Sequence, residues 1–323
     1  MSPISYQNRL SALLREIEVD IGSTNLSLLV LKSFAEAVSS LKGRDHHQFF
    51  QALLDLTDNI NSTEPKFAII IDSFHEILKL AYSEELHHLD EKFPLRKQKF
   101  LEKLSDLIRE EKREEKELIK NAMELDVEGK EILIHDNSRT VSRVLKAFKK
   151  AGKHFRVIIA EQDPEKTGPI IENLHKSRIP FRVVPAYMIA HVEEHVDMIF
   201  LGGLTLKSTM NFVMDPGTNG LVSQFHLMKK PIYVFMVTGK FSLWHAKKRT
   251  QVFTHVDQRK HYCKPINFER IKFSHDRVPA KFMKRIVNEK GVMTPNQVEK
   301  LFKQKLKERV KSDEKFRKQL TEF

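Results

Sequence analysis

Cysteine is almost absent from this chain, which limits the compartment in which we expect it to work. Its 323 residues include a single cysteine, Cys263, so no disulfide can form within the chain. Chains without disulfides are typical of a reducing compartment, and we therefore expect the cytoplasm. Lys260 and His261 lie close enough in sequence to lower the pKa of a thiol. We nevertheless interpret Cys263 as a structural residue in a basic, irregular segment.

Long apolar runs are also missing. No run approaches the roughly 18–20 residues that a spanning helix needs. The first residues, MSPISYQNRLSALL, contain neither a long apolar stretch nor a small-residue cleavage site, so we expect no signal peptide and no membrane segment. Glycine-rich phosphate loops are absent as well, because neither GxGxxG nor GxxxxGK[ST] occurs. The sequence thus gives no support for a dinucleotide, a P-loop nucleotide or any other cofactor.

Positive charge is in excess. The net charge is +12, with 41% hydrophobic and 30% charged residues, which is typical of a globular chain. The excess is concentrated between Lys240 and Lys272 and again in the last helix, from Lys303 to Lys311. We interpret both segments chiefly as solvated surface, and an RNA- or ribosome-associated role is the alternative that basic charge leaves open.

Residues 1–126 are predicted to form an all-helical domain. Apolar residues recur every three or four positions in LSLLVLKSFAEAV and in FAIIIDSFHEILKLAY. The run LIREEKREEKELIKNAMEL pairs opposite charges at helical spacing and predicts a long exposed helix with one apolar stripe. No repeat interrupts this part of the chain.

Residues 127–300 are predicted to form a Rossmann-like α/β domain, a doubly wound parallel sheet, and residues 301–323 a basic C-terminal helix. Short apolar runs such as EILIH, FRVIIA, FRVVP, DMIFLG and PIYVFMV alternate with helical segments, as in βαβ units. These segments include a short helix before DMIFLG and a helix expected over 223–229. One segment between two of these runs, HVEEH, matches a zinc peptidase pattern. Its third ligand is missing, so we expect no metal site there.

The carboxyl ends of parallel strands are where ligands bind in such sheets. The turn HDNSR follows the first strand, and Glu161 ends the second. The ligand-site candidates from this rule are therefore His135, Asn137, Ser138, Arg139 and Glu161. The rule also points to residues 185–187, 202–204 and 238–241, which follow the later strands. Asp, Asn and Ser are also good helix caps, so capping alone is a second interpretation of the turn.

The order of these motifs resembles one superfamily across roughly residues 15–300. The resemblance rests on the segments ILIHDNSRTVSRVLKAFKKAGKHFRVIIAEQDPEKTG, DMIFLGG, PGTNG, KKPIYVFMVTGKF and GVMTP. They are similar to the α, β and δ subunits of eukaryotic translation initiation factor 2B, most of all to the α type. The family includes the ribose-1,5-bisphosphate and methylthioribose-1-phosphate isomerases. The resemblance implies a helical domain joined to a Rossmann-like domain, assembled as a homodimer or hetero-oligomer. It also adds Gly217, Thr218 and Asn219, which match the family's Gly-Thr helix start, to the ligand-site candidates.

The resemblance also implies which residues would catalyse isomerisation. The isomerases carry a cysteine and an aspartate where this chain has Asp136 and Leu204. Leucine cannot exchange protons, so Asp136 is the only catalytic candidate and lacks its partner. Two phosphate-binding positions differ as well. Where the isomerases have an arginine, this chain has Ile21 at one position and Glu64, of opposite charge, at the other.

Three functions follow, in order of preference. The first is a non-catalytic protein like the initiation factor 2B α subunit, which acts by dimerisation and protein contacts and binds at most a small anionic ligand or sugar phosphate. The second is an aldose–ketose isomerase of a sugar phosphate that uses Asp136. The third is a nucleic-acid-binding protein that uses the basic segments.

Overall fold

The computed structural model describes most of the chain. The described residues are 13–14, 16–18, 21–40, 53, 55–57, 60, 67–81, 93–135, 137–161, 164–244, 252–261, 264–273 and 275–321. Predictions about Asp136, Glu64 and Cys263 fall outside these ranges. In the part of the chain that the structure describes, no helix has a stretch long and apolar enough to cross a membrane.

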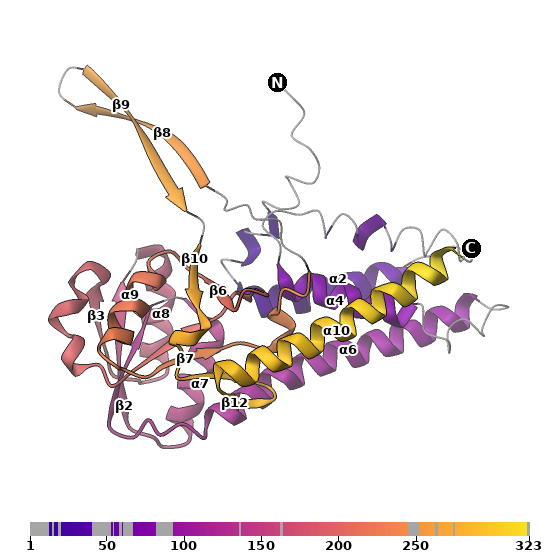
Figure 1. Cartoon of the computed structure of the whole chain (residues 1–323), viewed down its shortest axis with the longest axis horizontal. Helices are drawn as coiled ribbons and strands as arrows, with labels where there is room; N and C mark the ends of the chain where they lie inside the picture. Colours follow the sequence, from indigo (N-terminus) through magenta and orange to yellow (C-terminus); the bar gives the residue numbers. More distant parts are fainter. Residues whose placement is uncertain are drawn as a thin grey trace.

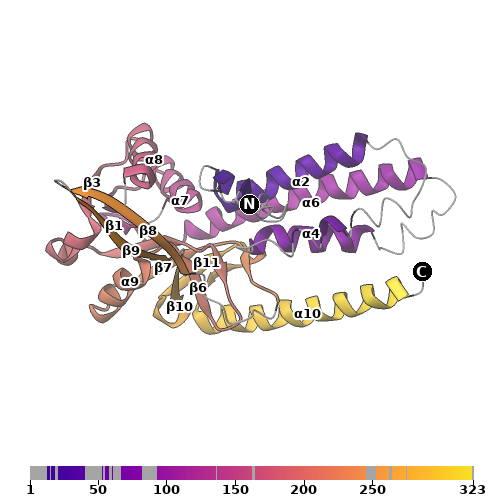
Figure 2. The same ribbon diagram turned by 90° about the horizontal axis from the view of Figure 1, so that it is seen from above.

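Three helices form the first layer of the molecule. They are α2 (Ser23–Ser40), α4 (Ala68–Ala81) and α6 (Phe93–Ala122), and they lie side by side in both views (Figure 1, Figure 2). Their apolar stripes meet through fully buried residues such as Leu31, Ile77 and Leu104. Burying an apolar stripe against its neighbours supplies most of a helix's stability, so this part folds as the periodicity predicts.

A seven-stranded sheet follows in the chain. Its spatial order is β12-β11-β7-β4-β1-β2-β3, and every neighbouring pair is parallel except β11 with β12. The strands are β1 (Lys130–Ile134), β2 (Phe155–Glu161), β3 (Phe181–Pro185), β4 (Met198–Gly202), β7 (Ile232–Phe235), β11 (Arg285–Asn288) and β12 (Gly291–Met293). The predicted apolar runs are confirmed as strands, because both faces of the sheet are covered.

Helices cover the two faces. On one face α7 (Arg139–Lys150) and α8 (Pro164–Lys176) share a core with the helical layer. On the other, α9 (Thr218–Leu227) and the start of α10 (Pro295–Thr321) pack against Leu133 and Ile199. The predicted fold class, a helical domain followed by a doubly wound Rossmann-like sheet, is confirmed.

Some local predictions differ from the structure. The helix expected over 223–229 begins earlier, at Thr218. The short helix before β4 consists of two 3₁₀ segments, η1 (Ala186–His191) and η2 (Glu193–His195), so HVEEH has no α-helical face on which two histidines align four residues apart. Among the described residues, no group of three His, Cys, Asp or Glu could hold a metal ion.

Two further sheets were missed in the sequence. One has three strands in the order β10-β6-β5, made by β5 (Thr205–Leu206), β6 (Asn211–Met214) and β10 (Asp276–Pro279). The other pairs β8 (Val252–His261) with β9 (Lys264–Phe273). The prediction of an irregular basic segment was therefore wrong. Charged residues among the apolar ones obscured the alternation with a period of two.

The last helix, α10, returns along the helical layer (Figure 1, Figure 2). It begins at Pro295, six residues before the boundary expected at 301, so that boundary falls inside the helix. Arg309 of α10 lies 3.2 Å from Asp72 of α4, and only 13% of its side chain is exposed. Asp313 of α10 lies 3.3 Å from the buried imidazole of His75. These contacts join the end of the chain to its beginning.

Candidate functional site

A cavity of about 410 Å³ opens where the helical layer meets the carboxyl ends of β1 and β4. Residues 21–25, the first turn of α7 and Gly202–Leu204 line it. The location is the one that the strand-end rule for parallel sheets predicts. This cavity is therefore the candidate ligand site.

The start of α7 forms one wall. Ser138 is the helix N-cap, with extended backbone angles (φ −75°, ψ 116°), and its hydroxyl accepts a hydrogen bond from the Val141 N–H at 3.3 Å. Capping satisfies one of the N–H groups that a helix leaves open at its start. Asn137, Ser138 and Arg139 all line the cavity, so the turn both caps the helix and contributes to the cavity wall.

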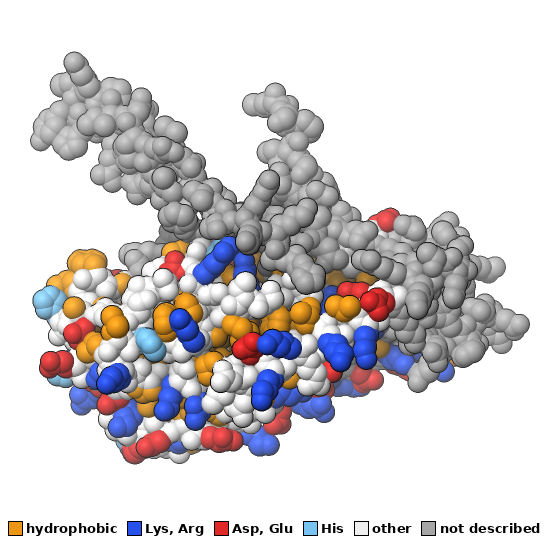
Figure 3. Space-filling view, viewed as in Figure 1, with side chains coloured by type: hydrophobic (Ala, Val, Ile, Leu, Met, Phe, Trp, Pro, Cys, Tyr) orange, Lys and Arg blue, Asp and Glu red, His pale blue; other side chains and the backbone are white. Residues whose placement is uncertain are grey.

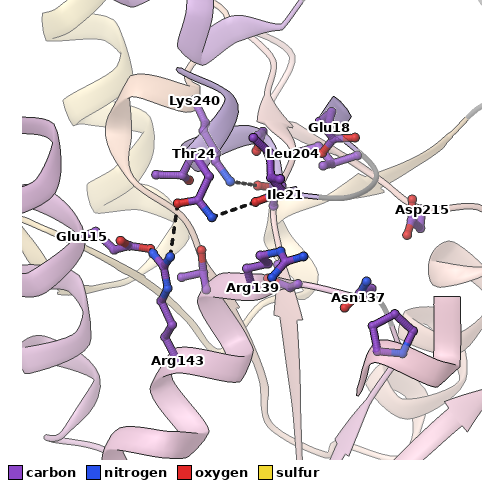
Figure 4. A pocket seen from close by; sticks show the side chains of 18 of the residues that line it. Glu18, Ile21, Thr24, Glu115, Asn137, Arg139, Arg143, Leu204, Asp215 and Lys240 are labelled. Atoms are coloured by element: carbon purple, nitrogen blue, oxygen red, sulfur yellow. Dashed lines mark hydrogen bonds and ion pairs between the residues drawn. The ribbon is translucent and has the colours of Figure 1, made fainter. Parts of the chain in front are cut away.

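The opposite wall comes from the helical layer. The Asn25 amide donates to the Ile21 carbonyl at 2.8 Å and accepts from Arg143 Nη2 at 3.2 Å. Arg143 also forms an ion pair with Glu115. Figure 4 shows these contacts, with Arg139 beneath Ile21. Arg143 is thus held by two partners from the helical layer and joins the two halves of the molecule.

Most of the positive charge in the cavity is balanced. Lys166 pairs with Asp215 at 3.3 Å, and the ammonium of Lys240, which is buried, donates to the Gly203 carbonyl at 3.2 Å. The charged lining residues are Arg139, Arg143, Lys166 and Lys240 against Glu18, Glu115 and Asp215. Burial raises the pKa of Glu18, while Lys240 opposes the shift. The cavity therefore suits one anionic group better than two phosphates.

His135, the first predicted site residue after β1, is not among the residues that line the cavity. Its side chain is buried, with Nδ1 3.1 Å from the Ala160 carbonyl, and burial lowers its pKa, so the ring is neutral at pH 7. A Cβ atom on Gly217 would lie 3.2 Å from His135 Nε2, and Gly217 has a φ of +91°. The ring and the glycine therefore shape the turn that begins α9.

The other predicted residues lie elsewhere. Glu161 ends β2, and it does not line this cavity. Thr218 is fully buried, and its hydroxyl donates to the Asp215 carbonyl at 2.7 Å. The Asn219 N–H donates to Asp276 at 2.8 Å. The structure thus brings Asn137, Ser138 and Arg139 together at the cavity and gives Thr218 and Asn219 contacts within the fold.

Several lining residues escaped the sequence reasoning. Lys240 is not among them, because it lies within residues 238–241, which follow β7 and to which the strand-end rule points. Lys166 and Asp215 form a pair only because α8 and the end of β6 meet in space. Glu18 and Asn25 come from the helical layer. No sequence pattern indicates that they face a sheet edge more than 100 residues away.

A second, smaller cavity of about 180 Å³ lies between α4, α6 and α10 and is strongly acidic. Burial is the main cause that raises the pKa of Glu111 to about 7 and that of Glu114 to about 8. Asp72 and Lys305 also line it. Lys305 and Arg309 belong to the basic helix, so part of its charge meets acidic groups of the helical layer.

Comparison with known proteins agrees with the fold and with the motifs. The model of the initiation factor 2 subunit family matches residues 19–295. An eIF-2B subunit 2-like translation initiation factor of Pyrococcus furiosus is 24% identical over 249 residues, which is 76% of this chain and 88% of that protein. The eIF2B α subunit of Dictyostelium discoideum is 24% identical over 183 residues, or 53% of this chain and 57% of its own.

Solved structures show the same architecture. The eIF-2B protein of Pyrococcus horikoshii superposes with a TM-score of 0.68 at 19% identity, over 90% of this chain and 98% of that one. The tetrameric eIF2B β₂δ₂ complex of C. thermophilum also gives a TM-score of 0.68, at 13% identity over 92% of this chain and 93% of that one. These likenesses concern the fold. Because the family model covers most of the sequence, this chain belongs to the initiation factor 2 subunit family.

Proposed function

We propose that this protein is a non-catalytic, initiation factor 2B α-subunit-like component of translation initiation or its regulation. It works in the cytoplasm by assembling with a second copy or with related subunits, and it binds at most one small anionic ligand. Family membership supports the link to translation initiation, since the relatives are named as initiation factor subunits. One relative is described as a tetrameric complex of two subunit types.

Leu204 carries the non-catalytic part of the proposal. The resemblance to the isomerases places their aspartate at this position, and here a leucine lines the cavity. General acid–base chemistry needs two groups that exchange protons on either side of the substrate. Of the three acids that line the cavity, Asp215 is paired with Lys166, and Glu115 with Arg143. Burial raises the pKa of the third, Glu18, so this carboxyl could exchange a proton, but a single group does not make the pair.

An exposed apolar surface supports the assembly role. Tyr187 of η1 is 87% exposed and Leu227 at the end of α9 is 82% exposed. Between them lies η2, which follows η1 in the chain and contacts α9: Gln224 of α9 donates to Glu193 of η2, and Lys230 donates to the Glu194 carbonyl at 3.2 Å. Large exposed apolar side chains on adjoining elements are typical of protein interfaces.

Sedimentation equilibrium of the full chain at micromolar concentration tests the assembly. We expect a dimer, and the Tyr187→Asp/Leu227→Asp variant should weaken it at least tenfold. Val310→Asp is the matched control, since Val310 is also exposed, at 43%, but lies on α10. A monomer at all concentrations would count against the proposal, and equal weakening by both variants would remove the role of this surface.

Proton NMR with a panel of aldose phosphates tests the absence of catalysis. We expect no ketose product from the wild-type chain. Turnover that is abolished by Asp136→Asn would replace the proposal with the isomerase alternative. Chemical shift changes without turnover, lost in Arg139→Gln, would instead agree with a bound anion that is not transformed.

A further inference from the structure

Glu18 is the acid that the beginning of the chain contributes to the ligand cavity. Its side chain is partly exposed, and its carbonyl accepts a hydrogen bond from the Gly22 N–H at 2.8 Å. Gly22 in turn lies against Arg139, since a Cβ atom on Gly22 would be 3.4 Å from Arg139 Cγ. In Figure 4, Glu18 and Asp215 lie on one side of the view and Lys240 on the other, with Arg139 between them. Glu18 is thus held at the wall of a cavity that also contains cations.

The surroundings of Glu18 decide how easily its carboxyl ionises. Burial has the largest effect and raises the pKa of Glu18 above its ordinary value of 4.5. Lys240 of η3 (Thr238–Lys240) and Lys166 of α8 oppose this shift, whereas Asp215, which follows β6, adds to it. The other charged groups that line the cavity are Arg139, Arg143 and Glu115. The Glu18 carboxyl therefore holds a proton at a higher pH than an exposed glutamate does.

The protonation state of Glu18 changes the charge that an anion meets in the cavity. When Glu18 is ionised, four cationic side chains face three carboxylates in the lining, which leaves an excess of one positive charge. Protonation of Glu18 leaves two carboxylates and doubles that excess. A carboxylate in the wall repels an anion, and partial burial weakens the screening of this repulsion. An anion in the cavity thus favours a proton on Glu18, and by reciprocity the proton favours the anion.

The surface of the molecule lacks this coupling. The net charge of +12 attracts anions in general, but Figure 3 shows basic and acidic side chains intermixed on the face it presents. On α10, for example, Lys303 pairs with Glu299 at 2.6 Å, and both side chains are exposed. Salt screens such exposed charges, and their carboxylates stay ionised near neutral pH. A response of anion binding to pH through a carboxyl therefore points to the cavity.

We infer that the ligand cavity takes up a proton on Glu18 when it binds an anion, so that the site releases its anion as the pH rises. Binding raises the pKa of the Glu18 carboxyl above its value in the free protein. The gain in affinity is complete below the pKa of the free protein and is lost as the pH rises through the pKa of the complex. The inference rests on the proposed anionic ligand and adds the regulation of its site by pH.

Isothermal titration calorimetry of the full chain with sulfate tests the inference at pH 5 and pH 8 and constant ionic strength. Sulfate keeps its two charges over this range, whereas phosphate esters titrate at about pH 6. We expect sulfate to bind about tenfold more tightly at pH 5, which corresponds to a change of one unit in the pKa of Glu18 on binding. Titrations at pH 6.5 in two buffers with different ionisation enthalpies should show net proton uptake with each bound sulfate.

Histidines also titrate between pH 5 and pH 8, so a variant must identify the carboxyl. Glu18→Gln resembles the protonated acid. It should bind sulfate at pH 8 about as tightly as the wild type does at pH 5, and its affinity should change less than twofold between these pH values. A gain of affinity at pH 8 cannot come from misfolding, so the result stands even if the variant is less stable.

Two further variants locate the effect. Glu16→Gln is the matched control, because Glu16 lies two residues earlier and is exposed. It removes the same formal charge and should change the affinity less than twofold at either pH. Adding Arg139→Gln to Glu18→Gln should weaken sulfate binding at least tenfold, because Arg139 lines the cavity. This loss would place the sulfate there.

The possible failures separate this inference from the proposed function. Equal affinity of the wild type at pH 5 and pH 8, or a pH dependence that persists in Glu18→Gln, would overturn the inference and leave the anion site standing. Equal gains in Glu16→Gln and Glu18→Gln would show that overall charge attracts the sulfate. No binding at 20 mM sulfate and pH 5, in either the wild type or Glu18→Gln, would remove the anion site and this inference together. The sedimentation test of the assembly role would be unaffected.

Discussion

Glu111 is expected to make the stability of this protein fall as the pH rises above 4.5. Its pKa is about 7 in the folded chain, chiefly because of burial, against 4.5 for the ordinary side chain. The hydroxyl of Ser73 lies 2.6 Å from the Glu111 carboxyl and 2.7 Å from the Ile69 carbonyl. A hydroxyl has only one proton. If Ser73 donates that proton to Ile69, the short contact with Glu111 requires a protonated carboxyl.

The magnitude follows from proton linkage. A carboxyl whose pKa is raised on folding favours the folded state at low pH, and this contribution is lost between pH 4.5 and 7. The full shift corresponds to about 3 kcal/mol. Since the Glu111 side chain is only partly buried, solvent reduces the effect, and we expect about 1–2 kcal/mol.

The Glu111→Gln variant isolates this effect, because glutamine resembles the protonated acid. Urea denaturation at pH 5 and pH 8 should show the variant gaining about 1–2 kcal/mol relative to the wild type as the pH rises. Glu110→Gln is the control. That residue is 44% exposed and pairs with Arg113 at 2.6 Å, so its effect should stay below about 0.5 kcal/mol at both pH values. An equal loss for Glu111→Gln at pH 5 and pH 8 would show that the carboxyl is ionised in the folded chain.

Two other predictions concern the packing around the cavities. Gly217→Ala should destabilise the protein by about 1–2 kcal/mol, since its φ is +91° and a Cβ would lie 3.2 Å from His135. Gly220→Ala, in the same helix with nothing within 4 Å, should instead stabilise by about 0.5–1 kcal/mol; melting temperatures that shift in the same direction would contradict this. Arg309→Met should cost about 2–3 kcal/mol in urea denaturation, because it removes one of the two cations, with Lys305, that favour the ionised carboxyl of Asp72. Adding Asp72→Asn should recover much of that loss, and two additive losses would show that the pair does not interact.

Much of the α/β part could be predicted because its signals are local. Apolar runs of four to seven residues bounded by polar turns define strands wherever the sheet is covered on both faces. The Ser138 cap is also local, since it involves an N–H only three residues away. The pairing of β8 with β9 was missed, because charged residues interrupt the apolar ones in both segments and hide the period-two signal of a strand.

The acidic cavity shows what local signals cannot supply. Ser27, Ser73 and Glu111 come from three different helices and are separated by 38 to 84 residues. In the sequence, Glu111 is one of many acids in a charged helix, and nothing distinguishes it from the exposed Glu110. Only the packing of α2 and α4 against α6 removes water from one of these neighbours.

The sequence by itself determined the alternation of strands and helices in the main sheet, the fold class and the family, because these depend on periodicity and on motifs whose spacing survives divergence. The tertiary structure decided which charged side chains form pairs and which are removed from water. It pairs Arg143 with Glu115 and Lys166 with Asp215 across the ligand cavity, and it places Arg309 against Asp72. The physical reason is that the energy of a charge depends on its distance from other charges and on its separation from water. Both quantities are set by how distant segments pack.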